Sequence, residues 1–312
     1  MGRKRKGLPL NGWLNIDKDM DMGATKVVAA VRRLTGAAKA GHAGTLDPMA
    51  TGVLPVALGE ATKTVPYMQD ADKDYGFTVR WGVATNTDDA AGEVIEKSDN
   101  RPSEAEIKAV LPEFTGVITQ VPPQFSAIKI QGQRAYDIAR RGDVAAIQPR
   151  EVTVYDLQCL AVEKDHAEFL MRCGKGTYVR AVARDMAKRL GTCGHVTVLR
   201  RMRVGNFSEE SAISLAKLEE ILHNKPPEQV LLPVAAALDD IPALPLTQDE
   251  ASRMSHGQTV RLLTVQDRER LKAIGVEIGQ YAGPILAMAG GNPLALASLE
   301  GAELKPVRVL NL

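Results

Sequence analysis

The most constraining feature of this chain is a short segment, residues 41–55, in which glycines and prolines surround a single acid. Pro48 disfavours the helical region for the residue before it, so we expect Asp47 on an extended or turn segment. Close backbone approach is permitted at Gly41, Gly44 and Gly52. Asp47 is also the only carboxylate in the sequence between residues 22 and 59. A lone acid on a stiff loop indicates a positioned nucleophile, although an ordinary turn would explain the Asp-Pro pair by itself.

Composition is that of an ordinary soluble globular protein, with 45% hydrophobic and 25% charged residues. A length of 312 residues suggests about two domains. No apolar run approaches the length that spans a membrane, and no CxxC spacing relates Cys159, Cys173 and Cys193. We therefore expect no membrane association, no zinc finger, no disulfide framework, and a reducing, cytoplasmic setting.

Positive charge is concentrated in one stretch of the sequence, although the net charge of the chain is only +1. Between residues 171 and 203 there are nine basic residues and one acid, Asp185. The nine are Arg172, Lys175, Arg180, Arg184, Lys188, Arg189, Arg200, Arg201 and Arg203. Contacts with the phosphates of a nucleic acid require such a cluster, so this stretch predicts a nucleic-acid surface.

Hydrophobic periodicity and turn residues indicate a mixture of helices and strands. Strands are expected at residues 13–17, from Tyr75 onward, at 152–162 and at 167–173. Helices are expected at residues 25–34, 60–68, 103–110, 133–141 and 178–190. On the last helix, Arg180, Arg184 and Lys188 align on one polar face. Prolines between residues 226 and 245 indicate a linker, and the residues beyond it are typical of a small β-rich module.

A longer pattern around Asp47 resembles the signature of the TruB family of pseudouridine synthases, in its bacterial form. It reads G-H-x-G-T-L-D-P-x-A-x-G-x-L-P over residues 41–55 and continues as G-x-A-T-K over residues 59–63. Further matching segments follow in order: KDY at 73–75, TxTxDxxG at 85–92, PPxFSAxK at 122–129, CGKGTYVR at 173–180 and LRR at 199–201. The resemblance covers residues 8 to 210, and the last hundred residues match much less clearly.

The resemblance implies an α+β fold. A catalytic domain of the pseudouridine synthase type is expected over residues 8–235, with a mixed, largely antiparallel sheet, helices and RNA-binding insertions. Residues 243–312 are expected to form a small β-rich domain that resembles the PUA-like RNA-binding module of many family members.

The resemblance also implies roles for individual residues. Asp47 is the catalytic aspartate, Tyr75 stacks on the reacting base, and Arg180 pairs with the aspartate, which would keep it ionised and oriented. Judged alone, a tyrosine at a strand start is usually structural, and Arg180 would equally suit a phosphate contact or a solvated helix face. The implied substrate-binding residues are His42, Tyr75, Tyr178 and Leu199. For Leu199 a core position fits almost as well.

RNA contacts are predicted at Lys18, Lys63, Lys129, Arg184, Lys188, Arg200 and Arg201.

The implied reaction breaks the glycosidic bond of a uridine, turns the base and rejoins it through C5. Nothing is oxidised, so neither a cofactor nor a metal is required. The sequence leaves open whether the first step is attack at C6, attack at C1′ or proton abstraction from C2′.

The predicted function is isomerisation of uridine to pseudouridine in the T-loop of tRNA, at position 55. The expected enzyme is a monomer without an obligatory protein partner. One rival is the related catalytic subunit of guide-RNA pseudouridylation complexes, whose members usually carry further extensions than this chain. Another is a catalytically silent tRNA-binding or tRNA-folding protein. Binding would need only a basic surface, so the presence of Asp47, Tyr75 and Arg180 together favours the enzyme.

Overall fold

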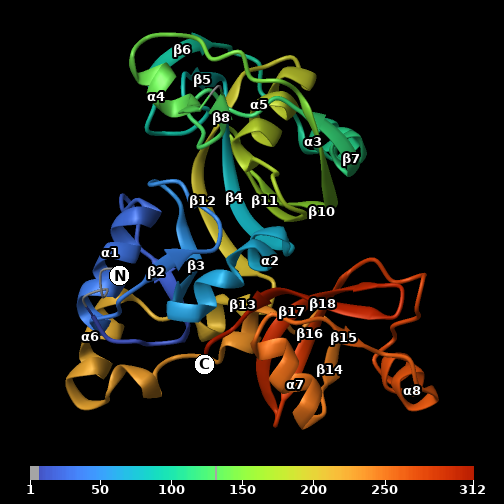
Figure 1. Ribbon diagram of the computed structural model, residues 1–312. Helices are drawn as coiled ribbons and strands as arrows, with labels where there is room; N and C mark the ends of the chain where they lie inside the picture. The colour runs from blue at the N-terminus through green and yellow to red at the C-terminus, as the bar shows by residue number, and fades with distance from the viewer. Residues whose placement is uncertain (1–6, 131) are drawn as a thin grey trace.

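A nine-stranded sheet forms the centre of the first part of the chain (Figure 1). The computed structural model describes residues 7–130 and 132–312, without the side chain of Lys129. The strands of this sheet are β1 (Gly12–Lys18), β2 (Ala40–His42), β3 (Thr51–Leu58), β4 (Lys73–Trp81), β7 (Gly116–Gln120), β10 (Arg150–Val162), β11 (His166–Cys173), β12 (Gly194–Val204) and β13 (Phe207–Ser208). Their main order is β1-β3-β12-β4-β11-β10-β7, with β2 beside β3 and β13 beside β12. Among these described pairs, only β3 and β12 run parallel, which confirms a mixed, largely antiparallel sheet.

Helices and short hairpins surround this sheet. The helices are α1 (Ala24–Thr35), α2 (Val65–Asp70), α3 (Glu104–Val110), α4 (Ala135–Arg140), α5 (Val179–Arg189) and α6 (Leu215–Asn224). The hairpins pair β5 (Val83–Thr85) with β6 (Val94–Lys97) and β8 (Lys129–Ile130) with β9 (Gln133–Arg134). Helix α5 contacts β12 and β4, while α1 contacts β2, β3 and α6. Strands β4 and β12 lie side by side at the centre of this sheet, and helix α5 packs against both (Figure 1).

Local sequence signals account for several of these elements. Helix α3 begins with the expected capping box, because the Ser103 hydroxyl accepts from the backbone of Glu106 and the Glu106 carboxylate accepts from the backbone of Ser103. Helix α1 ends at Gly36, whose φ of 69° favours glycine. The predicted strands at residues 13–17, 152–162 and 167–173 are confirmed as β1, β10 and β11. Strand β4 begins two residues before Tyr75 and alternates buried and more exposed positions as expected.

Two of the predicted helices were wrong in extent. Residues 60–68 form a 3₁₀ helix over Gly59–Lys63, followed by the separate helix α2. Pro66 has no N–H to donate, so it is tolerated only in the first turn of α2 and cannot continue a helix from the preceding residues. Residues 133 and 134 belong to the β8–β9 hairpin, and α4 begins at Ala135.

A second, five-stranded sheet follows the proline-containing segment and has its own hydrophobic core. Its order is β14 (Ala243–Pro245), β16 (Pro284–Ala289), β17 (Asn292–Glu300), β18 (Glu303–Val309) and β15 (Val260–Arg261), accompanied by α7 (Gln248–Ser255) and α8 (Val265–Ala273). The division into domains at residues 8–235 and 243–312 stays a prediction. In the part of the chain that the structure describes, no helix combines the length and the apolar character needed to cross a membrane.

The C-terminus returns to the first part of the chain (Figure 1). Leu310 is buried in a cluster that includes Trp13 and Phe207. The backbone N–H of Asn311 donates to the Glu60 carboxylate at 2.8 Å, and Lys63 Nζ donates to the carbonyl of Val309 at 2.8 Å. These contacts attach the second sheet to the segment that follows β3.

Candidate active site

Asp47 lies on an irregular loop between β2 and β3, as its following proline predicts. The loop is held by apolar side chains, since Ala43, Leu46 and Ala50 are all buried. At the start of β3, Gly52 has a φ of 100°, and a Cβ there would lie 2.2 Å from the carbonyl oxygen of Arg201. Only glycine fits this approach. The Asp47 side chain remains 29% exposed, so its carboxylate is fixed in place but open to a ligand.

Arg180 brings helix α5 against this loop. Its Nε donates to Oδ2 of Asp47 at 2.8 Å, although the two residues are 133 positions apart. Its Nη1 donates to the carbonyl of Thr87 at 2.7 Å, and its Nη2 donates to the carbonyl of Phe125 at 3.0 Å. The Arg180 side chain is only 3% exposed. The guanidinium is therefore held in one plane by three segments and presents a fixed positive charge to Asp47.

The loop between β5 and β6 contributes a residue that the sequence reasoning did not single out. Asp89 is buried, and its Oδ2 lies 3.5 Å from Nη1 of Arg180. Its other oxygen accepts from the Thr87 hydroxyl at 2.6 Å and from the backbone of Ala91 at 3.0 Å. Arg180 thus lies between two carboxylates, of which Asp47 is the more exposed. The sequence signal that could have identified Asp89 was the TxTxDxxG segment, which matches the family pattern although no role was assigned to its aspartate.

Tyr75 lies on β4, opposite Arg201 of β12, and is 8% exposed. Burial raises the pKa of the Tyr75 phenol above its ordinary value, and the neighbouring Arg201 partly offsets this effect. The phenol therefore stays protonated at neutral pH and can donate a hydrogen bond. The Arg201 guanidinium donates to the carbonyls of Val53, Thr45 and Gly44, so it also supports the loop that carries Asp47.

The other three predicted substrate-binding residues occupy different environments. His42 ends β2, and its Nδ1 has no hydrogen-bond partner among the described residues. Burial, and then the positive charge of Arg201, lower the pKa of His42, so its imidazole is neutral at pH 7. Tyr178 is half-buried immediately before α5. Leu199 is 4% exposed and belongs to the main hydrophobic core.

The structure argues against two of the predicted RNA contacts. Lys18 is 1% exposed, and its Nζ donates to the carbonyls of Asp19, Met22 and Pro48. Burial lowers the pKa of Lys18 to about 8. Arg201 is likewise 1% exposed and faces backbone carbonyls. Both cations therefore support the Asp47 loop from inside the protein, where a phosphate does not reach them.

The basic stretch is also less positive than its sequence suggests, because acids from elsewhere in the chain lie against it. Six of its nine basic residues form ion pairs: Lys175 with Asp70, Arg180 with Asp47, Arg184 with Asp88, Arg189 with Glu113, Arg200 with Asp17, and Arg203 with Asp74. Lys188 is exposed on α5. Lys63 pairs with Glu60, and the Lys129 side chain lies outside what the structure describes.

This arrangement of Asp47, Arg180 and Tyr75 can support attack on an electrophilic carbon or removal of an acidic proton. An oriented carboxylate can act as a nucleophile or a base, and a neutral phenol nearby can assist the movement of a proton. Across residues 7–130 and 132–312, no group of three or more histidine, cysteine or acidic side chains is placed to hold a metal ion.

Comparison with known proteins identifies relatives along the whole chain. A family model described as TruB family pseudouridylate synthase (N terminal domain) matches residues 32–179. A second, described as tRNA pseudouridylate synthase B C-terminal domain, matches residues 180–239. The tRNA pseudouridine synthase B of Caulobacter vibrioides is 50% identical over 313 residues, and that of Rhodospirillum rubrum is 47% identical over 313 residues. Each alignment covers 100% of this chain and 100% of the relative.

Solved structures show the same fold at lower identity. A chain from the crystal structure of a Cbf5-Nop10-Gar1 complex aligns with a TM-score of 0.74 and 24% identity, covering 99% of this chain and 91% of that one. A chain from an H/ACA RNP bound to a substrate RNA containing 2′-deoxyuridine aligns with a TM-score of 0.73 and 22% identity, covering 100% and 92%.

Proposed function

The chain belongs to the TruB family of pseudouridine synthases, and on that basis we propose that it isomerises uridine to pseudouridine in tRNA. The observation that carries this proposal is the Asp47–Arg180 pair at 2.8 Å, in a chain whose full length aligns with synthases of this name. The proposed target is the T-loop uridine at position 55. A loop nucleotide is a suitable target because its base is less stacked than one in a duplex and is cheaper to turn out.

In the proposed mechanism, the target uridine turns out of the RNA and enters the site beside Asp47. The Asp47 carboxylate, held by Arg180, attacks the nucleotide or abstracts a proton from it, and the glycosidic bond breaks. The freed uracil turns and rejoins the sugar through C5, and Asp47 is released from the bond it formed or returns the proton it took. A base in the site removes the proton from C5, and N1, which is no longer bonded to the sugar, takes up a proton. The atoms of the nucleotide are conserved, so the reaction needs no oxidant, group donor or cofactor.

The surrounding residues have proposed roles in holding the base. Tyr75 stacks on the uracil, and its neutral hydroxyl assists the removal of the C5 proton. Tyr178 contacts the same base, whereas Leu199 supports these residues from the core. His42, as a neutral imidazole, contacts the RNA where the base has left its stack. The proposed phosphate contacts are the exposed Lys188 and the partly exposed Lys63, Arg184 and Arg200. Lys129, whose side chain lies outside what the structure describes, stays a proposed contact.

The proposed enzyme acts alone, as a monomer in the cytoplasm, where tRNA is its substrate. The catalytic subunits of guide-RNA complexes have a similar fold, but a fold shared at 22–24% identity does not transfer their partners. The relatives that align over their full length at 47–50% identity are named as tRNA enzymes, which supports an enzyme that acts without partner proteins. The buried Arg180 argues against a silent RNA-binding protein, because it donates a hydrogen bond to Asp47 and binding alone would not require this pair.

The experiment that tests this proposal is mapping of pseudouridine in bulk tRNA that lacks the modification, with and without the purified protein. We expect new pseudouridine at position 55 when the protein is added by itself. Modification that requires a guide RNA and partner proteins would move the assignment to the guide-RNA complexes. Binding of tRNA without any new pseudouridine would favour the silent binding protein.

A further inference from the structure

Tyr178 is held by the side chain of a residue 58 positions earlier in the chain. The backbone N–H of Tyr178 donates to Oε1 of Gln120 at 2.8 Å, and the Tyr178 carbonyl accepts from Nε2 of Gln120 at 3.1 Å. Gln120 is 1% exposed. Its amide thus binds Tyr178 as the backbone of a neighbouring strand would, with both its donor and its acceptor in use.

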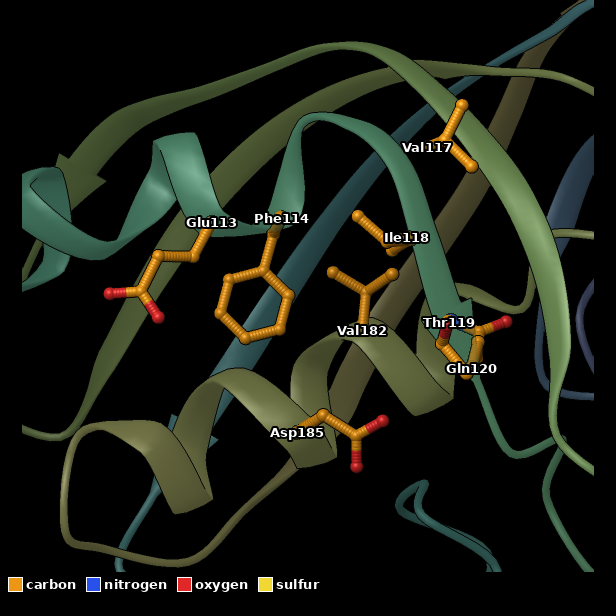
Figure 2. A pocket seen from close by; sticks show the side chains of 8 residues that line it. All are labelled: Glu113, Phe114, Val117, Ile118, Thr119, Gln120, Val182 and Asp185. Carbon is orange, nitrogen blue, oxygen red and sulfur yellow. The ribbon is translucent and has the colours of Figure 1, made fainter.

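The cross-strand partner of Gln120 contacts the same residue. Arg150 pairs with Gln120 where β10 meets β7. The Arg150 guanidinium lies over the Tyr178 ring, 5.1 Å from its centroid, and its Nη2 donates to the carbonyl of Gly176. Figure 2 shows Gln120 at the end of β7, beside α5. One cross-strand pair therefore holds both the backbone and the ring of Tyr178.

The contact with Gln120 lies at the start of helix α5. Tyr178 is the N-cap residue of α5, and its side chain makes no capping hydrogen bond. Its carbonyl also accepts from the backbone of Ala181 and Val182 in the first turn. Arg180 lies in that turn, so a shift of Tyr178 would also move the guanidinium that binds Asp47.

We propose that Gln120, supported by Arg150, is a positioning residue for the isomerisation, which aligns Tyr178 with the base and Arg180 with Asp47. This inference rests on the proposed function. Gln120 touches no reacting atom and acts through the backbone of Tyr178. Its replacement should therefore lower kcat more than it raises KM, because the alignment of catalytic groups matters most in the chemical steps.

Gln124 offers a matched control a few residues along the chain. Its amide makes the same pair of hydrogen bonds, accepting from the backbone N–H of Ala145 at 2.8 Å and donating to the Ala145 carbonyl at 3.1 Å. Ala145 is buried in the segment between α4 and β10. Gln124→Met therefore removes two equivalent bonds without altering the hold on Tyr178.

The experiment compares the full-length wild type with Gln120→Met, Gln120→Glu and Gln124→Met, using unmodified tRNA, steady-state and single-turnover rates, and thermal melting. Gln120→Met should lower kcat about 10-fold to 100-fold, with KM changed less than about threefold, because misalignment by about 1 Å can cost that much in rate. Gln124→Met should leave kcat within about threefold of the wild type, whatever its effect on melting.

Gln120→Glu supplies a readout that a purely structural role would not produce. An ionised carboxylate can accept from the Tyr178 N–H but cannot donate to the Tyr178 carbonyl, whereas a protonated carboxyl can do both, as the amide does. The charged side chains near this position include Glu113 and Asp185, which line an adjacent cavity of about 300 Å³ that Gln120 also borders (Figure 2). They also include Arg150, the cross-strand partner of Gln120, and Arg184, which donates to the carbonyl of Val121. Burial of this position, which is 1% exposed, and the two acids would raise the pKa of a carboxyl here, while Arg150 and Arg184 oppose them.

The kcat of Gln120→Glu relative to the wild type should therefore recover as the pH is lowered from about 8 to about 6, whereas the same ratio for Gln120→Met should stay constant. If Gln120→Met does not fold, this pH dependence decides the question. A pH-independent Gln120→Glu ratio, or a Gln120→Met rate equal to that of Gln124→Met, would overturn the positioning role while leaving the proposed function in place. Absence of pseudouridine with the wild type would overturn both.

Discussion

Replacing Arg180 with lysine should cost most of the catalytic rate although it keeps the positive charge. The guanidinium donates three hydrogen bonds, to Asp47, Thr87 and Phe125, from a side chain that is 3% exposed. An ammonium that stays near Asp47 keeps one of them and leaves the other two acceptors without their donor. Hydrogen bonds to a charged group contribute about 1.5–3 kcal/mol each, so two lost bonds correspond to about 3–6 kcal/mol.

If that loss fell entirely on the transition state, kcat would fall by about 150-fold to 25,000-fold. Part of this free energy will be lost from the stability of the fold instead, so we expect kcat to fall by an amount near the lower end of this range. The assay is the single-turnover rate of pseudouridine formation at saturating enzyme, with RNA affinity measured separately. Arg189→Lys is the control, because Arg189 lies on the same helix in an exposed pair with Glu113. Its rate should stay within about twofold of the wild type. A rate for Arg180→Lys within about threefold of the wild type would refute the argument that this geometry matters.

Three further predictions concern the base pocket and the substrate. Tyr75→Phe keeps the ring but removes the hydroxyl, so turnover should fall severely with a modest loss of binding; unchanged turnover would reduce Tyr75 to a stacking platform. Burial lowers the pKa of His42 in the folded protein. As the pH falls below about 6.5, His42 takes up a proton in the unfolded chain before it does so in the folded protein, so the free energy of unfolding should decrease. An NMR titration of His42 with a midpoint at or above 6.5 would contradict this. An isolated T-stem and loop should react with a kcat/KM within about a hundredfold of full-length tRNA, whereas a loop closed by base pairing should not react, and a reactive closed loop would contradict base flipping.

The features that the sequence predicted best depend on nearby residues. The capping box at Ser103 and the end of α1 at Gly36 each involve contacts within a few positions. The absence of a helix at Asp47 follows from Pro48, which disfavours the helical region for the residue before it. These signals are local, so they hold wherever the rest of the chain lies.

The features that the sequence could not predict depend on distant partners. Periodicity placed Arg180 on the polar face of a helix, yet it is buried, because it pairs with Asp47, as the family resemblance implied, and with Asp89 on a second distant loop. Periodicity assigns a charged residue to solvent and carries no information about such partners. The positive charge available on residues 171–203 was overestimated for the same reason, because acids from other parts of the chain pair with most of these basic residues. The sequence assigned no role to Gln120, because a glutamine in a strand gives no sign of the distant Tyr178 to which its amide binds.

The central claim is that Asp47 carries out the chemistry, and Asp47→Asn tests it most directly. Asparagine has nearly the same shape but neither the charge nor the nucleophilicity of a carboxylate. The measurement is pseudouridine at position 55 of unmodified tRNA after incubation with the variant, together with its affinity for the same RNA. We predict no pseudouridine and an affinity within about tenfold of the wild type, because phosphate contacts dominate binding. Formation of pseudouridine at a rate near that of the wild type would contradict the account.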